Sequence, residues 1–401
     1  MSVTKPASPR PANRLRVLPL VTLAVVLSVA VLAGSLLRPD GTSETGHGKL
    51  RAGRPELQRM LDDVVTGRDR LAPGATAFVS GPRGTWVGSA GVADVATRDA
   101  MPPAARMRLQ SVSKIYTAAL IFQLAQERRL HVGDTVEHWL PGVLPYGRRI
   151  TIRQLLMMRS GIVDLADLMR DSARYLDRVH DRKLRSQLNA IGRRIDTNPA
   201  VEVSPLWLIR LAAWQPLLFT PGTQDHYSGI GYELLGLIAA RAGAKPLPDL
   251  YRERIFKPLG LRQTAYDPQG PISGPHARGY LIGANGTMTD ATNWHWLAGA
   301  AAGIVSNASE TAAFLVDLMR GRLLERRWLE DMRRDIWRSG AASGCAGKAY
   351  GWGGAGDAYK TDAFVNADGT RVAVLLLNGG RYDGRDDMAA KRTMTALYCA
   401  A

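Results

Sequence analysis

The tetrad Ser111-Val112-Ser113-Lys114 is the strongest candidate for chemistry in this sequence. It opens the apolar run 115–124, which predicts a helix with the serine in its first turn and the lysine one turn later on the same face. A serine hydroxyl becomes nucleophilic when a neighbouring base takes its proton, and a desolvated lysine amine can be that base. The positive end of the helix dipole also lies at Ser111. The spacing therefore indicates acyl transfer through a serine nucleophile.

Tyr227 is the second candidate, because it follows the Pro221-Gly222 turn and precedes the helical run 232–240. A loop phenol near a lysine can relay a proton to a leaving group. The alternative is a tyrosine that only packs at the start of a helix. The tetrad alone is also a weak signal, since residues 2–5 fit it in the N-terminal tail. The surrounding elements must decide.

The elements that position these residues are strands at both ends of the folded part and helices between them. Periodicity and turn residues predict helices over 54–70 and 386–399, and hairpins from the paired runs 75–80 with 85–91 and 358–365 with 371–377. The segment from about 130 to 286 is a mainly helical lobe. This order predicts an α/β fold of the α+β type, with an antiparallel sheet built from both terminal segments and flanked by helices. A small-molecule site is expected in the cleft between the lobes.

The N-terminal region predicts a membrane anchor. Residues 17–37 form 21 consecutive uncharged, mostly aliphatic positions after a basic tail over 1–16. As a helix this run spans about 30 Å, and the positive-inside bias places everything after it outside the cytoplasm. A cleaved signal is the alternative, with Val31-Leu32-Ala33 as the cleavage site. Residues 38–53 are a predicted linker, and 54–401 are the predicted enzyme domain.

The two cysteines, Cys345 and Cys399, would then lie on the oxidising side of the membrane. We predict that they form a disulfide, which would stabilise the fold by about 4 kcal/mol through loop closure. The alternative is two separate buried thiols.

Composition excludes several other functions. Lys and Arg total 52 against 36 Asp and Glu, a net charge of +16, but the arginines are scattered without a nucleic-acid-binding pattern. We therefore predict no nucleic-acid partner. The 7 histidines are dispersed and no pair has zinc-like spacing, so we expect no metal and no cofactor.

Several segments together resemble secreted serine D-alanyl-D-alanine carboxypeptidases and class C β-lactamases, which are penicillin-recognising serine hydrolases. In chain order they are Ser111 to Lys114, Leu140 to Gly142, Ile152 to Leu156 with Ser160-Gly161, Tyr227, Phe256 to Leu261, His276 to Tyr280, Ala302 to Ser306 and Leu375 to Asn378. The resemblance covers roughly residues 57–399 and implies a β-lactamase/transpeptidase-like fold. It also implies that Ser111 forms an acyl-enzyme, that Lys114 and Tyr227 share the proton transfers, and that backbone N–H groups hold the oxyanion.

Two motifs depart from this family. Its second motif is usually Tyr-x-Asn, and Gly229 occupies the Asn position here. Its third motif is Lys-Thr-Gly or His-Thr-Gly on the edge strand, where this chain places Trp352-Gly353-Gly354. In that register Ala355 supplies the second oxyanion N–H. The triplet 360–362, Lys-Thr-Asp, looks like the missing motif but belongs to the following strand.

The substitutions affect the expected substrate more than the expected chemistry. Trp352 and two glycines offer no charge-assisted hydrogen bond to a substrate carboxylate. Either Lys348 or Lys360 replaces the missing cation, or the pocket suits an uncharged ester or amide. His226, next to Tyr227, either contributes to the site or is a surface histidine.

We expect a membrane-attached, extracytoplasmic serine hydrolase that acts on a small-molecule or peptidoglycan-peptide amide, a β-lactam or an ester. The alternative is a non-catalytic binding or regulatory protein of the envelope that keeps the fold. The sequence leaves the natural substrate and the oligomeric state open.

Overall fold

The computed structural model describes residues 53–67, 70–170, 177, 179–183, 185–186, 204–268, 271–294, 299–336, 348–356, 358–381 and 385–401. The predicted anchor over 17–37 lies outside these residues, and so does Cys345. The predicted disulfide with Cys399 therefore stays a prediction. Among the helices of the described part, none is both long and apolar enough to cross a bilayer.

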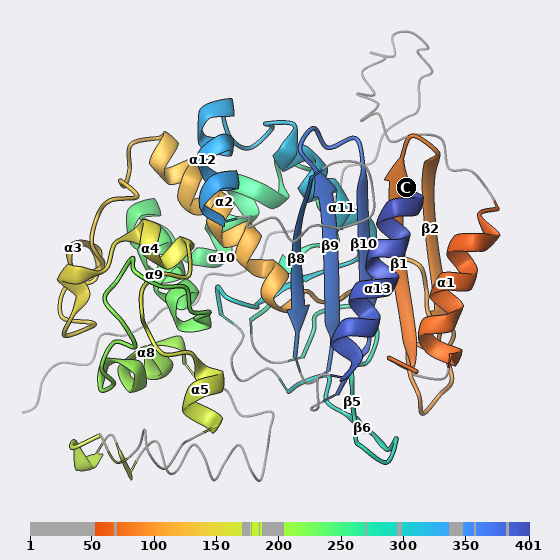
Figure 1. Cartoon of the computed structure of the whole chain (residues 1–401), viewed down its shortest axis with the longest axis horizontal. Coiled ribbons are helices and arrows are strands. Elements are labelled where there is room, and N and C mark those ends of the chain that lie inside the picture. Colours follow the sequence, from red (N-terminus) through yellow and green to blue (C-terminus); the bar gives the residue numbers. More distant parts are fainter. Residues whose placement is uncertain are drawn as a thin grey trace, which may run out of the picture. The chain divides into compact units, whose positions relative to one another are not determined.

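The main sheet has five antiparallel strands in the order β2-β1-β10-β9-β8 (Figure 1). The strands are β1 (Gly74–Gly81), β2 (Gly84–Gly91), β8 (Ala349–Ala355), β9 (Lys360–Asn366) and β10 (Val372–Leu377). The N-terminal hairpin joins the C-terminal strands through β1 and β10, where Ala77 pairs with Leu375. The predicted sheet from both ends of the chain is confirmed, and β8 is its edge strand.

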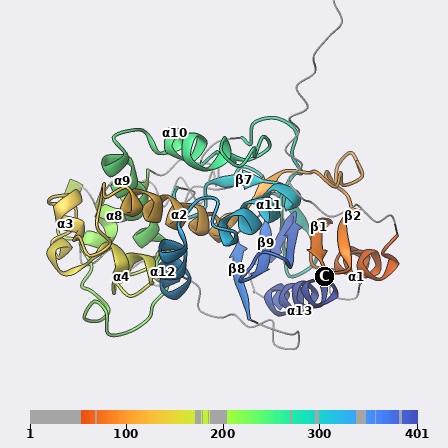
Figure 2. The ribbon, with the colours of Figure 1, turned by 90° about the horizontal axis from the view of Figure 1, so that it is seen from above.

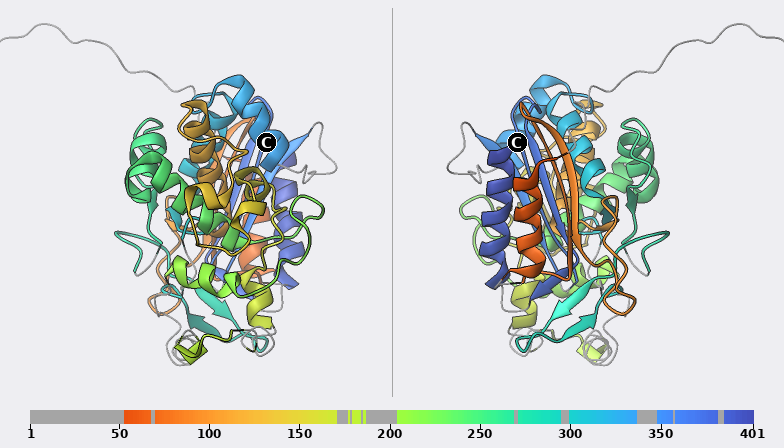
Figure 3. Two further views of the ribbon diagram at one scale, coloured as in Figure 1. Left: turned by 90° about the vertical axis from the view of Figure 1, so that its left-hand side faces the viewer. Right: turned by 90° about the vertical axis from the view of Figure 1, so that its right-hand side faces the viewer.

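Helices cover both faces of this sheet (Figures 2 and 3). On one face lie α1 (Pro55–Thr66) and α13 (Arg385–Ala400), and on the other lie α2 (Ser113–Gln126) and α11 (Ala308–Met319). Side chains alternate between the faces along each strand, so β10 contributes Val374 to the core beside α2 and Leu375 to the core beside α1 and α13. The two predicted terminal helices are confirmed, although α1 ends four residues before the predicted boundary.

Burial fixes the two helices nearest the predicted site. All residues of α2 from Ser113 to Ala125 are buried, as expected of an apolar helix in a domain core. The other helix is α9 (Gly229–Gly243), which is capped by Ser228, whose Oγ accepts from the Gly231 N–H at 3.2 Å.

The middle of the chain is mainly helical, as predicted. Its helical segments, with one later helix, are α3 (Val136–Trp139), η2 (Gly147–Arg149), α4 (Ile152–Leu156), α5 (Leu165–Arg170), α8 (Pro205–Ala213), α10 (Leu247–Tyr251), η3 (Arg252–Phe256, a π-helix) and α12 (Arg326–Ile336). Two small sheets, ordered β3-β7-β4 and β11-β5-β6, were not predicted. Their strands are β3 (Met107–Arg108), β4 (Ala265–Tyr266), β5 (Tyr280–Ile282), β6 (Met288–Asp290), β7 (Ile304–Ser306) and β11 (Gly379–Arg381). Strands of two or three residues are too short to show a period of two.

Candidate active site

Ser111 lies in η1 (Gln110–Val112), a short 3-10 turn directly before α2. Two hydrogen bonds tie this turn to β7: the Leu109 N–H donates to the Ile304 oxygen at 2.8 Å, and the Ile304 N–H donates to Ser113 Oγ at 3.0 Å. Gln110 has a φ of 50°, a left-handed conformation that costs a non-glycine residue about 1–3 kcal/mol. A strained, anchored turn thus presents Ser111 at the positive end of α2.

Ser111 Oγ contacts both of the other predicted catalytic residues. It lies 2.6 Å from Tyr227 Oη and accepts a hydrogen bond from Lys114 Nζ at 3.1 Å. Lys114 Nζ also lies 4.9 Å from the centre of the Tyr227 ring. Ser111 and Lys114 therefore form one hydrogen-bonded cluster with Tyr227, which lies more than a hundred positions further along the chain.

Lys114 is almost completely buried, with 1% of its surface exposed. Its Nζ donates to the Ala301 oxygen at 2.9 Å and lies 5.7 Å from the ring centre of Tyr232. Burial raises the pKa of Tyr232, so this neighbour stays a neutral phenol. The amine is thus held by one backbone carbonyl and directed at the serine.

Tyr227 precedes α9 in the loop that the sequence predicted, and 44% of its surface is exposed. Gly229 begins α9 two residues later, and its N–H donates to Asp164 Oδ1 at 2.7 Å. A Cβ at residue 229 would lie 3.4 Å from that oxygen, an ordinary contact. The site therefore has a carboxylate beside the position where the resemblance places an asparagine.

His226 pairs with an acidic side chain of the neighbouring loop. Its Nε2 lies 2.7 Å from Asp167 Oδ2, which also accepts from the Asp164 N–H at 3.2 Å. We conclude that His226 helps to hold the Asp164 loop against the start of α9, rather than facing Ser111.

The edge strand β8 passes directly beside η1. A Cβ at Gly354 would lie 2.9 Å from the Ser111 nitrogen and 2.5 Å from the Leu109 oxygen, closer than side chains pack. Only glycine allows the strand to approach the serine this closely. The predicted register, with Trp352, Gly353 and Gly354 in β8, is the one that the structure has.

The same register turns the Ala355 N–H away from the sheet. Gly356 N–H donates inward to the Tyr359 oxygen at 3.1 Å, and backbone groups alternate in direction along a strand. Ala355, one residue earlier, therefore directs its N–H to the free edge of the sheet, outside the β8–β9 hydrogen bonds. An oxyanion donor on this strand must have its N–H on that edge.

Neither Lys348 nor Lys360 lies where it could replace the missing cation of the edge strand. Trp352 packs against the core on the α2 side of the sheet. Lys360 is buried on the opposite side, because it points to the same face of β9 as Phe364, which packs on the α13 side. Lys348 lies 5.5 Å from the ring centre of Tyr350. About 13 Å of strand separates Lys348 from Trp352. The triplet 360–362 is confirmed as part of β9, not of the edge strand.

Sequence reasoning missed Glu233, which lies on α9 behind Lys114. Its carboxylate accepts from the N–H groups of Ala300 at 3.0 Å and Ala301 at 3.1 Å. Burial raises the pKa of this carboxyl to about 7, although those hydrogen bonds and the charge of Lys114 act in the opposite direction. A lone acidic residue inside the apolar run 232–240 was the available signal.

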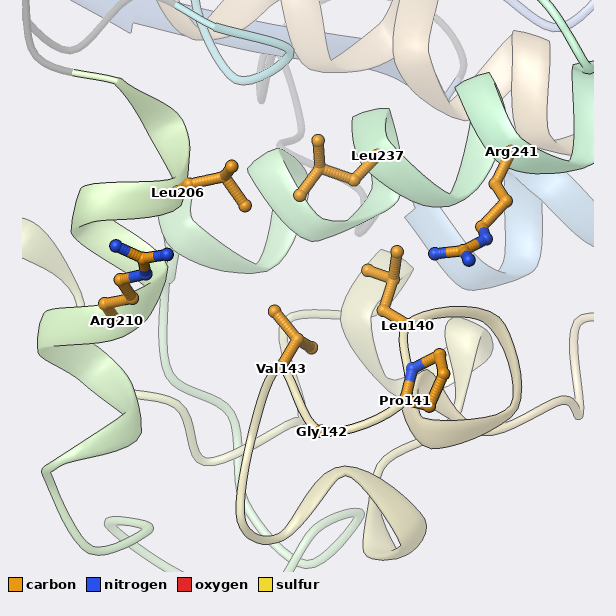
Figure 4. A pocket seen from close by; sticks show the side chains of 8 residues that line it. All are labelled: Leu140, Pro141, Gly142, Val143, Leu206, Arg210, Leu237 and Arg241. Atoms are coloured by element: carbon orange, nitrogen blue, oxygen red, sulfur yellow. The ribbon is translucent and has the colours of Figure 1, made fainter. Parts of the chain in front are cut away.

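A separate pocket of about 330 Å³ lies on the helical lobe (Figure 4). Its apolar walls come from the loop 140–143, α8 and α9, and it is flanked by Arg210 and Arg241. None of the predicted site residues lines this pocket. Across the described ranges, clusters of His, Cys, Asp and Glu suited to a metal ion are also absent.

The fold agrees with comparisons against known proteins. The family model described as beta-lactamase matches residues 57–397. The chain belongs to the beta-lactamase family. This assignment confirms the resemblance seen in the sequence and, with it, the β-lactamase/transpeptidase-like fold.

Individual members of the beta-lactamase family are only distantly similar. Human mitochondrial serine beta-lactamase-like protein LACTB is 25% identical over 276 residues, which is 58% of this chain and 49% of that protein. A putative D-alanyl-D-alanine carboxypeptidase of Salmonella paratyphi A is 28% identical over 163 residues, or 40% and 34% of the two chains. The chain thus spans about half or less of these curated relatives.

A solved structure gives wider coverage. The D-stereospecific amidohydrolase from Streptomyces sp. has a TM-score of 0.70 and 25% identity, covering 87% of this chain and 100% of that one. The fold of that amidohydrolase is therefore shared over 87% of this chain.

Proposed function

We propose that this protein is a serine hydrolase that forms an acyl-enzyme on Ser111. The observation that carries the proposal is the position of Ser111 Oγ, within hydrogen-bond distance of both Lys114 Nζ and Tyr227 Oη. A nucleophile in contact with a candidate base is the minimum that this chemistry needs. The buried amine and the half-exposed phenol give the proton one protected and one solvent-facing position.

Acylation begins when Ser111 Oγ attacks the substrate carbonyl carbon and its proton passes to the Lys114–Tyr227 pair. The N–H groups of Ser111 and Ala355 receive the oxyanion. The carbon–leaving-group bond then breaks, and the pair returns the proton to the departing amine or alcohol. In deacylation, water attacks the acyl carbon and its proton passes to the Lys114–Tyr227 pair. The bond between the acyl carbon and Ser111 Oγ then breaks, and the pair returns the proton to Ser111 Oγ.

We further propose that the preferred substrates are amides or esters without a carboxylate next to the scissile bond. Trp352 occupies the edge-strand position where the family has a cation, and Lys360 lies on the opposite face of the sheet. An apolar indole favours an uncharged, apolar group there.

The proposed location is the extracytoplasmic face of the membrane, with residues 17–37 as the anchor. Its support is the uncharged run and the basic tail before it. Fusions of alkaline phosphatase after residue 53 test this, because that enzyme folds only in an oxidising compartment. Phosphatase activity that is lost when residues 1–38 are removed supports the proposal. An inactive fusion that carries all of residues 1–53 contradicts it.

The catalytic proposal is tested by covalent labelling. The full chain is incubated with a fluorescent β-lactam and, separately, with an activated ester, alongside Ser111→Ala and Ser80→Ala. Ser80 Oγ pairs with Thr85 in the distant β1–β2 hairpin, so its variant controls for loss of a serine hydroxyl. We expect ester turnover that Ser111→Ala abolishes and Ser80→Ala retains.

The outcome with the two probes also separates the alternatives. Ester turnover without a β-lactam adduct supports the preference for uncharged substrates. No adduct and no turnover with either probe would contradict the enzyme and favour the non-catalytic binding protein, for which the changes at Gly229 and Trp352 are the specific evidence.

A further inference from the structure

Glu233 is a buried acid that the acyl-transfer steps above do not use. Only 4% of its surface is exposed, in a helix whose other neighbouring side chains are apolar. Its two oxygens accept from consecutive N–H groups, those of Ala300 and Ala301. Gly299 completes the cradle, since a Cβ there would lie 1.9 Å from Glu233 Oε2. Successive backbone N–H groups around one carboxylate form an anion-binding nest.

The turn that binds Glu233 is also the turn that binds Lys114. The Ala301 oxygen accepts from Lys114 Nζ at 2.9 Å, and the Ala300 oxygen accepts from Thr117 Oγ1 at 2.6 Å. Helix α2 therefore holds the carbonyl side of the turn 299–301, while α9 holds its N–H side through Glu233. The direction of the Ala301 carbonyl, and with it the position of the amine, depends on both.

Resting on the proposed function, we infer that Glu233 is a positioning residue: in its ionised form it fixes the turn 299–301 so that the Ala301 carbonyl holds Lys114 Nζ against Ser111. Glu233 itself contacts no reacting atom. An ionised carboxylate accepts charge-assisted hydrogen bonds from the N–H groups of the nest, whereas a protonated one is neutral, accepts more weakly and carries a hydrogen on one oxygen.

The environment of Glu233 makes this arrangement sensitive to pH. The titratable groups facing it are Lys114 from α2, Tyr251 from α10 and Tyr266 from β4. Burial raises the pKa of both tyrosines, so they stay neutral phenols. Because burial raises the pKa of Glu233 to about 7, the nest loses its anion as the pH falls below neutral. Turnover should fall with it.

The test compares Glu233→Gln with Glu233→Asp and with Glu310→Gln in the full chain. Glu310 is a matched control, because it also accepts backbone N–H groups, those of Arg262 at 2.9 Å and Gln263 at 2.9 Å, but it lies in the first turn of α11 and makes no contact with Lys114 among these hydrogen bonds. kcat and KM for the activated ester are measured from about pH 5 to 9, and circular dichroism checks that each variant is folded.

We expect Glu233→Gln to lower kcat about ten- to hundredfold above neutral pH, with KM little changed, since displacing a catalytic group by about 1 Å has effects of this size. The acid limb of the profile should also disappear, because glutamine does not titrate. Glu233→Asp should keep a titrating limb, and Glu310→Gln should keep both kcat and the limb. A Glu233→Gln variant with the wild-type kcat and pH profile would overturn the inference.

A second measurement separates this inference from the proposed function. Amide NMR shifts of ¹⁵N-labelled alanines are followed with pH in wild type and in Glu233→Gln. Ala300 and Ala301 should titrate together with a midpoint near 7 in wild type only. If they do not move, Glu233 is not the group that holds the turn, whatever the activity. If they titrate while the wild type lacks Ser111-dependent turnover, the proposed function fails and the control of the turn by Glu233 stands.

Discussion

Adding one methyl group at Gly354 should damage catalysis far more than folding. A Cβ at this residue would lie 2.5 Å from the Leu109 oxygen, 2.9 Å from Gln110 Cβ and 2.9 Å from the Ser111 nitrogen. All three belong to the backbone or to a Cβ, so no flexible side chain can swing away. The substitution Gly354→Ala must therefore move β8 and η1 apart.

The size of the effect follows from these distances. Carbon atoms pack best at about 3.5–4.0 Å, so the strand and the turn must separate by about 0.6 Å or more. This motion carries the Ala355 N–H away from the oxyanion position, and complete loss of such a donor costs about 10²–10³ in kcat. We expect kcat/KM for an activated ester to fall about tenfold to 10²-fold. Stability should fall by about 1–3 kcal/mol, the usual cost of an overpacked methyl group.

The assay pairs ester kinetics with urea unfolding, and Gly231→Ala is the control. A Cβ at Gly231 would make an ordinary contact, 3.5 Å from Leu155 Cδ2. In helix α9 alanine is favoured over glycine by about 1 kcal/mol, so this variant should be active and no less stable. If Gly354→Ala keeps at least a third of the wild-type kcat/KM, β8 does not supply an oxyanion donor beside Ser111.

Three further predictions concern the cluster around Ser111. Tyr227→Phe removes the oxygen 2.6 Å from Ser111 Oγ and should lower kcat about 10²–10⁴-fold with the fold intact. Pre-steady-state ester kinetics measure this, and an acylation rate equal to that of the wild type would rule out a role for the phenol. Glu233 has a pKa raised from 4.5 to about 7 in the folded state, so its contribution to stability is present below pH 4.5 and is lost as the pH rises through 7. Wild type should thus lose about 3 kcal/mol relative to Glu233→Gln across that range in urea unfolding, and parallel stability curves would contradict the shift. Trp352→Lys should raise the kcat/KM ratio for a D-alanyl peptide carboxylate over its amide about tenfold, and an unchanged ratio would show that residue 352 does not face the substrate.

The architecture was predictable because its signals are local. Each hairpin shows two β-prone runs around a turn, and α1 and α13 show helical periodicity. The order of these elements then favoured a sheet built from both termini. The resemblance supplied what local signals cannot, namely that Tyr227 lies against Ser111 although 116 positions separate them.

Contacts made by the backbone could not be predicted in the same way. The Ala301 carbonyl that holds Lys114 comes from a run of alanines and glycines with no chemical signature. Asp164 was missed because its contact with Gly229 depends on how the α5 loop packs against α9. The sequence correctly placed Lys360 outside the edge strand, but only the alternation of core side chains along β9 shows that it faces α13. In each case the determining feature is three-dimensional packing of a segment whose residue types are ordinary.

Three energetic costs lie around Ser111, and they favour the enzyme over the non-catalytic binding protein. Gln110 adopts a left-handed conformation at a cost of about 1–3 kcal/mol. Lys114 and Glu233 are nearly fully buried, although buried charges are frequently no more stable than apolar residues of similar size. A scaffold kept only for binding elsewhere gains nothing from any of these. Each is explained if the strained turn aims a nucleophile, the buried amine takes its proton, and the acid keeps that amine in place.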